Sequence, residues 1–404
     1  MNDCGYDYKS RKIVEALRSG IPSYDVGRYF SSARQDILGE FQDAFDRLAD
    51  SGTSESRIIS GKYGEGKTHL LNTIGSMAQS HNMAVSMVTL SKETPLSNMA
   101  HIYSRIMQNT YLPGHVQPGI SFIIDQLSLS SAVTSSLLEY ILTHLEVNRL
   151  YYVFKSLLGT QDDEEKYLLH ADLEGDFIAP AAIRKIYRRI FGEAVAFNGN
   201  FVRTKHISDY IAFLSRLFRL SGYDGWVILF DEAELIGRLG RRSRHKAYLH
   251  MDGFLRPGRI EGVYSVFAFN ASFVPDVIEA KHEYEGVEKN DTLLPDMRVK
   301  IKETIEKVAG ATQLAPLSRE ETADVLERIL RYHGAAYGWK PQMDRSDFMR
   351  ATDSYGYLLR TRIRAAVEML DQLYQYGKIG EIRATELGQI SFDEDESLSL
   401  DEFI

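Results

Sequence analysis

Cysteine and long apolar runs are the features that this sequence has least of. Among 404 residues there is one cysteine, Cys4, which excludes an intrachain disulfide and a cysteine-rich metal site and fits a reducing compartment. No run approaches the roughly 18 apolar residues of a membrane helix, and the first residues lack the apolar core of a secretory signal. We therefore expect a cytoplasmic protein without a membrane partner.

An excess of positive charge is also missing. The formal net charge of −9 means that any contact with a polyanion must come from a local basic patch. Two stretches qualify: the first contains Arg184, Lys185, Arg188 and Arg189, and the second contains Arg238, Arg241, Arg242, Arg244 and Lys246. Each stretch is either a solvated helix face or a surface that contacts DNA phosphates.

The remaining composition is that of an ordinary folded protein. With 44% hydrophobic and 25% charged residues, the chain is expected to form two or three packed units. Short apolar segments at 57–60, 84–90, 225–232 and 262–270 predict buried strands that alternate with helices. This pattern predicts an α/β fold, with a parallel sheet flanked by helices and a binding crevice at the carboxyl ends of the strands.

Helical periodicity and turn signals predict how the chain is divided. We expect an N-terminal helical lead-in over 1–50, a core that carries the sheet over 51–95 and 223–312, a helical insertion over 96–222, a C-terminal helical domain over 313–390 and an acidic tail over 391–404. In the lead-in, Ile37, Phe41, Ala44, Phe45 and Leu48 form one apolar helix face. Ser318 and Glu321 have the spacing of a capping box, which places a helix start there.

The stretch SGKYGEGKTHL, residues 60–70, carries the strongest functional signal. Gly61, Gly66, Lys67 and Thr68 satisfy the pattern G-x-x-x-x-G-K-[ST], and Gly64 lies between the two required glycines. In such a loop, backbone N–H groups surround the β-phosphate, the lysine spans the β- and γ-phosphates and the threonine ligates Mg²⁺. The predicted nucleotide-binding set also includes His69. The alternative is a glycine turn with a surface lysine.

Polar residues end two of the other predicted strands. In WVILFDEAE, Asp231 would hold Mg²⁺ through water and Glu232 would orient and polarise the attacking water. Because both acids are present, the pattern favours hydrolysis over passive binding, although a helix cap at a strand end is the alternative. Asn270 ends VFAFN and either meets the γ-phosphate or the attacking water, or begins a turn.

Together with LLRTRIR near the C-terminus, these motifs resemble the Walker A, Walker B, sensor 1 and sensor 2 motifs of an AAA+ P-loop ATPase, in that chain order. The segment IVEALRSGIPSYDVGRYF and the closing LSLDEF are similar to the ATP-binding proteins of BREX phage-defence systems, of the BrxC/BrxD type. The resemblance implies an ATPase that uses ATP and Mg²⁺, forms homo-oligomers and acts on DNA or with a defence partner such as a helicase. The long insertion departs from a compact AAA+ core.

The resemblance also implies roles for further residues. Val26, Gly27 and Arg28 match the segment near the adenine. Arg360 best fits the sensor 2 arginine, with Arg362 and Arg364 as rivals. An arginine finger from a neighbouring subunit would be Arg256 or Arg259, although an arginine before a proline is often structural.

Two other classes of function compete with a DNA-linked ATPase. One is a nucleotide-gated assembly scaffold or signalling switch, in which the insertion and the acidic tail bind protein. The steep salt dependence of DNA binding through lysine and arginine would separate these two classes. The other is a GTPase or small-molecule kinase, which is disfavoured because no [NT]-K-x-D motif is present.

Overall fold

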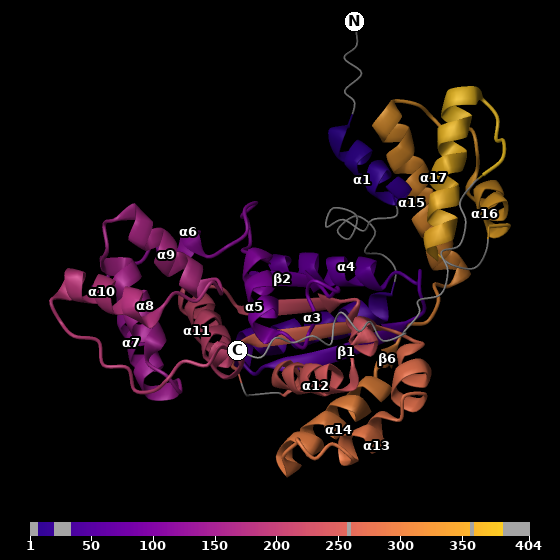
Figure 1. The fold of residues 1–404 in the computed structure, drawn as a ribbon. Coiled ribbons are helices and arrows are strands. Elements are labelled where there is room, and N and C mark those ends of the chain that lie inside the picture. Colours follow the sequence, from indigo (N-terminus) through magenta and orange to yellow (C-terminus); the bar gives the residue numbers. More distant parts are fainter. Residues whose placement is uncertain (1–6, 20–33, 257–259, 356–358, 383–404) are drawn as a thin grey trace, which may run out of the picture.

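The protein is built on a mostly parallel six-stranded sheet with helices on both faces (Figure 1). The computed structural model describes residues 7–19, 34–256, 260–355 and 359–382. The strands are β1 (Glu55–Gly61), β2 (Met83–Thr89), β3 (Thr110–Tyr111), β4 (Gly225–Asp231), β5 (Val263–Asn270) and β6 (Thr312–Gln313). Their order is β3-β2-β4-β5-β1-β6, and β3 alone runs antiparallel to its neighbour among the described strands. The predicted α/β fold and its four long strands are confirmed.

Helices α3 (Gln35–Ser51) and α4 (Lys67–Ser80) cover one face of the sheet. Phe41 and Phe45 of α3 pack on Tyr264 of β5, with ring centroids 5.9 and 5.5 Å away. The predicted apolar face of this helix is confirmed except at Ile37, which is half-buried while the neighbouring Leu38 is buried.

Three helices cover the other face: α5 (Met99–Gln108), α11 (Arg203–Leu220) and α12 (Arg241–Leu255). Helix α14 (Pro295–Ala309) packs against α12. Phe218 of α11 packs on Trp226 of β4, with ring centroids 5.2 Å apart. The first two of these helices belong to the segment that was predicted as an insertion. They form part of the sheet's own helical layer, because their apolar faces are buried against the strands.

The remainder of the insertion extends to the left of the sheet in Figure 1. It consists of α6 (Ser121–Ile124), α7 (Ala132–His144), α8 (Arg149–Gly159), α9 (Asp163–Leu173) and α10 (Pro180–Phe191). Its buried residues join those of the sheet in one continuous core. The insertion is therefore an outgrowth of the sheet domain.

The C-terminal helices α15 (Arg319–Tyr337), α16 (Arg345–Asp353) and α17 (Leu359–Tyr376) have a separate core, at the upper right of Figure 1. The predicted capping box of Ser318 and Glu321 begins α15. Helix α1 (Tyr8–Ser19) packs into this core, and its Arg18 donates to Asp371 of α17 at 2.9 and 2.7 Å. The predicted lead-in over 1–50 is thus divided, because the apolar face of α1 is buried in the C-terminal core and that of α3 on the sheet.

Three short segments complete the described fold. They are η1 (Ala233–Arg238), η2 (Val274–Glu279) and α13 (Glu283–Glu288). No helix in the described part of the chain is long and apolar enough to cross a membrane. The predicted acidic tail over 391–404 lies outside the described residues.

Candidate nucleotide-binding site

The order of the strands brings the three motifs to one edge of the sheet. Gly61 at the end of β1 and Asn270 at the end of β5 are register partners, and the Ala271 N–H donates to the Gly61 carbonyl at 3.1 Å. Strand β4, which ends at Asp231, lies on the other side of β5. Because all three strands are parallel, their polar ends meet at the carboxyl edge, as the sequence predicts.

Backbone geometry forms the loop between β1 and α4. Gly64 and Gly66 have φ angles of +80° and +86°, a region that residues with a Cβ rarely occupy. The Lys67 Nζ donates to the carbonyls of Gly61 at 2.9 Å and Lys62 at 3.2 Å. This lysine is buried, with 8% of its surface exposed, so it is no surface lysine beside a glycine turn.

Thr68 and Asp231 meet across the sheet edge. The Thr68 hydroxyl hydrogen-bonds to the Asp231 carboxylate, and the Glu232 N–H donates to Asp231 Oδ1 at 2.9 Å. Burial raises the pKa of Asp231, and these two hydrogen bonds oppose the rise. The described residues contain no cluster of three or more His, Cys, Asp and Glu side chains that would hold a metal. The pair fits Mg²⁺, which takes one or two protein ligands and completes its shell with water and phosphate oxygens.

Glu232 directly precedes η1 in a left-handed conformation, with φ at +56°. Burial raises the pKa of Glu232, and the negative charge of Asp231 adds to the rise. The positive charges of Lys67 and Arg360 oppose it, which places both cations within electrostatic range of the Glu232 carboxyl.

A third acid, Glu234, is buried next to Glu232 and was not among the predicted residues. Burial, followed by the charge of Glu232, raises the pKa of Glu234 to about 7. Its Oε2 accepts the Asn270 N–H at 3.1 Å, and Asn270 Oδ1 accepts the Ser272 N–H at 3.0 Å. The bond from Ser272, two residues further on, is the one expected if Asn270 begins a turn. The only sequence signal for Glu234 was its place in DEAE.

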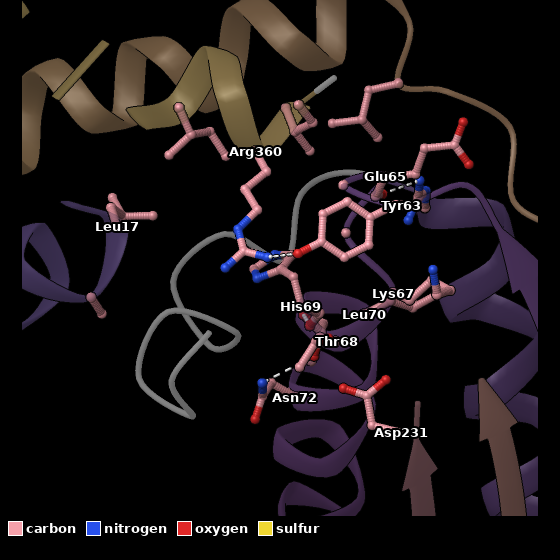
Figure 2. A pocket seen from close by; sticks show the side chains of 18 of the residues that line it. Leu17, Tyr63, Glu65, Lys67, Thr68, His69, Leu70, Asn72, Asp231 and Arg360 are labelled. Atoms are coloured by element: carbon pink, nitrogen blue, oxygen red, sulfur yellow. Dashed lines mark hydrogen bonds between the residues drawn. The ribbon is translucent and has the colours of Figure 1, made fainter. Parts of the chain in front are cut away.

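A cavity of about 570 Å³ lies between the sheet and the C-terminal helices (Figure 2). One wall consists of the loop, the first turns of α4 and the two acids at the end of β4. The other wall is largely apolar and consists of Ala16, Leu17, Leu317, Val325, Leu359 and Ile363. The predicted His69 also lines the cavity. This division fits a nucleotide, since the phosphates would meet the loop and the base would meet the apolar wall.

Arg360 lies at the start of α17 and reaches the loop (Figure 2). Its Nη1 donates to the Tyr63 hydroxyl at 2.8 Å. Arg362 instead pairs with Asp353 at 2.6 Å within the C-terminal helices, and neither Arg362 nor Arg364 lines the cavity. Among the three rivals, the structure brings Arg360 to the site.

Arg256, one of the two predicted arginine-finger candidates, lies away from the cavity. Arg256 directly follows α12, where it donates to both Asp252 oxygens at 2.8 Å and to Glu303 at 3.2 Å. The adjacent Leu255 carbonyl accepts from Ser56 near the start of β1, so Arg256 lies at the amino edge of the sheet, opposite the site. A role as a finger in a neighbouring subunit stays a prediction. Val26, Gly27, Arg28 and Arg259 lie outside the described residues.

Arg34 is a pocket residue for which the sequence held no motif. It has a left-handed φ of +60°, and its N–H donates to Glu321 of α15 at 2.7 Å. Its guanidinium donates to the carbonyls of Glu65 at 2.8 Å and Ala315 at 3.2 Å. Arg34 therefore connects the loop to the segment that leads into the C-terminal helices.

The structure corrects part of the predicted DNA-contact set. Arg244 is buried with Glu283, which it contacts at 3.0 and 2.8 Å, because this end of α12 packs against α13. Arg244 is thus unavailable to DNA, whereas Arg241 and Arg242 are exposed. On α10, Arg189 pairs with Glu165, and Arg184 lies over the Phe197 ring. Lys185 and Arg188 are exposed, without an ion-pair partner among the described residues.

A sequence model of the family described as BREX system ATP-binding protein BrxC/D matches residues 7–134 and 197–386. The chain belongs to the BrxC/BrxD family. It is an ATP-binding protein of a BREX phage-defence system. All residues that line the cavity lie in the matched ranges, whereas α8, α9 and α10 of this BrxC/BrxD protein lie between them. No curated protein matches the chain.

Proposed function

We propose that this BrxC/BrxD protein is an AAA+ ATPase that hydrolyses ATP with Mg²⁺ and couples the hydrolysis to DNA or to a defence partner. The observation that carries the proposal is the convergence of Lys67, the Thr68–Asp231 pair and Glu232 on one wall of a cavity whose other side carries Arg360. A protein that only bound ATP would need the lysine and the metal pair but no carboxyl group placed to act on water.

Each side chain has a distinct chemical role in this proposal. Lys67 neutralises the β- and γ-phosphates from its place among the loop carbonyls. Thr68 and Asp231 hold Mg²⁺, which when bound supplies charge neutralisation at the phosphate oxygens. Glu232 accepts a hydrogen bond from the attacking water and so orients a lone pair of the water oxygen toward the γ-phosphorus. This role requires an ionised Glu232, which the nearby positive charges of Lys67 and Arg360 favour.

The test is steady-state ATP hydrolysis by the purified chain, with and without duplex and single-stranded DNA. Turnover that DNA stimulates, and that Lys67→Ala removes, would support the proposal. Tight ATP binding without turnover under any of these conditions would overturn the hydrolytic part. That result would favour the nucleotide-gated scaffold, whose partner would then be sought with the ATP-bound protein.

We propose α10 as the contact with DNA. Its apolar residues Ile183, Ile186 and Tyr187 are buried, so its basic residues all lie on the solvent side. The helix itself contains no acidic residue. Such a face binds phosphates without reading base edges.

We expect Lys185→Ala and Arg188→Ala each to weaken duplex binding at low salt. Each substitution should reduce the slope of log K against log salt concentration by about one, because one phosphate contact is lost. Fluorescence anisotropy over a salt series measures this slope. Arg345→Ala on α16 is the matched control, since it removes the same charge from an exposed arginine that is paired with Asp324 and Glu327. An unchanged slope in both α10 variants would contradict the proposal.

The same proposal includes a homo-oligomer in which Arg256 or Arg259 completes a neighbour's site, and a helicase or another defence-system protein as partner. The position of Arg256 supports a role in a neighbouring subunit, since its side chain is 36% exposed at the sheet edge opposite the cavity of its own chain. Light scattering with and without ATP tests for the oligomer.

A further inference from the structure

Three contacts join the phosphate loop to the first turn of α17. The Arg360 Nη1 donates to the Tyr63 hydroxyl at 2.8 Å, and the Arg360 Cζ lies 5.7 Å from the centroid of the Tyr63 ring. The Arg360 N–H also lies 3.3 Å from the Gly64 carbonyl. Figure 2 shows the Arg360 guanidinium meeting the Tyr63 hydroxyl, and both residues line the cavity.

Phosphate binding by the loop does not require a tyrosine at position 63. Tyr63 occupies one of the unspecified places in G-x-x-x-x-G-K-[ST], where the backbone makes the phosphate contacts. The aromatic ring and the hydroxyl therefore serve another purpose. Within the structure their partner is Arg360, which lies about 300 residues further along the chain.

The contact occupies only part of the guanidinium. An arginine has five N–H donors in a rigid planar fork, and the Tyr63 hydroxyl takes one of the two donors on Nη1. The Arg360 Nε is buried without a hydrogen-bond partner in the described part of the chain. Because the guanidinium is planar, the bond at Nη1 also orients its remaining donors beside the loop. The Arg360 charge lies within electrostatic range of Glu232.

We propose that Tyr63 is a positioning residue for Arg360. Its hydroxyl fixes the guanidinium at the phosphate loop, so that a nucleotide bound by the loop meets Arg360 in one orientation and draws the C-terminal helices with it. This inference rests on the proposed function, in which the loop binds the phosphates of ATP and Arg360 contacts them.

The test is a double-mutant cycle on ATP affinity. The full-length chain, Tyr63→Phe, Arg360→Ala and the double variant are titrated with ATP and Mg²⁺ in a calorimeter. Phenylalanine keeps the ring and removes only the hydroxyl, so we expect Tyr63→Phe to weaken ATP binding about threefold to tenfold, the range of one hydrogen bond. The same substitution should have no effect in the Arg360→Ala background.

A matched control comes from the C-terminal core. The Tyr337 hydroxyl accepts from Arg18 at 3.0 Å and donates to Glu15 at 3.4 Å, and none of these three residues lines the cavity. Tyr337→Phe therefore removes an arginine–tyrosine bond outside the cavity lining. It should leave ATP affinity unchanged. A purely structural role for Tyr63 would weaken binding equally with and without Arg360, and that result, or an unchanged affinity in Tyr63→Phe, would overturn the inference.

The readout is independent of hydrolysis. If the unmodified chain binds ATP without turnover, the proposed hydrolytic function fails while the cycle still decides the role of Tyr63. If the chain hydrolyses ATP but the cycle shows no coupling, the role of Tyr63 fails alone. Unmeasurable ATP binding by the unmodified chain would overturn both.

Discussion

Glu232→Gln is expected to lower the rate constant of ATP hydrolysis by about two to four orders of magnitude, the range of one positioned proton acceptor. The amide has nearly the same shape as the carboxyl group but cannot accept the proton of the attacking water. ATP affinity should change by less than about threefold, because the phosphate contact of Lys67 and the Mg²⁺ ligands Thr68 and Asp231 remain. Single-turnover hydrolysis measures the rate constant, and calorimetric titration measures the affinity.

Two variants make this result specific. Lys67→Ala should lose ATP affinity itself, since the buried cation is removed from the loop. Glu234→Gln changes a neighbouring buried acid and retains an oxygen for the Asn270 N–H, so its rate should fall by less than about tenfold. If Glu232→Gln hydrolysed ATP at the rate of the unmodified chain, the assignment of Glu232 would be wrong.

The sheet and the phosphate loop could be predicted because their signals are local. Four strands are apolar runs bounded by turn residues, and the motifs of Gly61, Asp231 and Asn270 each begin at the end of one of them. Parallel strands then bring Gly61, Asp231 and Asn270 to one edge without any further information. By contrast, β3 and β6 have two residues each, too few to show a hydrophobic pattern.

The contacts between the phosphate loop and the C-terminal helices could not be predicted, because they join distant parts of the chain. Arg34 contacts Glu321, and Tyr63 contacts Arg360, across nearly 300 residues in each case. The place of α1 in the C-terminal core likewise leaves no trace in its own periodicity. Composition misled the prediction at Arg244, because a run of basic residues on one helix contains both exposed and buried positions.

The insertion contains a buried charge network on which the second large effect depends. Arg149 of α8 pairs with Asp172 of α9, and both side chains are almost fully buried. The Arg149 Nε donates to the Tyr210 hydroxyl at 3.0 Å, and that hydroxyl donates to Asp172 Oδ1 at 2.7 Å. The network joins α8 and α9 to α11, the helix that packs on the sheet.

Arg149→Ala is expected to lower the free energy of unfolding by about 3–5 kcal/mol, because it leaves the Asp172 carboxylate buried without its counter-ion. Urea denaturation measures this loss, and hydrogen exchange should place it in α8, α9 and α11. ATP affinity should persist in the folded fraction, since none of these helices lines the cavity.

The double variant Arg149→Met with Asp172→Leu decides whether this loss of stability arises from the unpaired charge of Asp172. Replacing a buried ion pair by apolar side chains of similar volume is often neutral or stabilising, so the double variant should recover most of the lost stability. Arg189→Ala, which removes the exposed partner of Glu165 in the same insertion, should leave the unfolding midpoint nearly unchanged. If the double variant were as unstable as Arg149→Ala, the contribution of Arg149 would come from its packing, including its contact with the Phe201 ring at 4.8 Å. In that case the charge pair would not hold the insertion on the sheet.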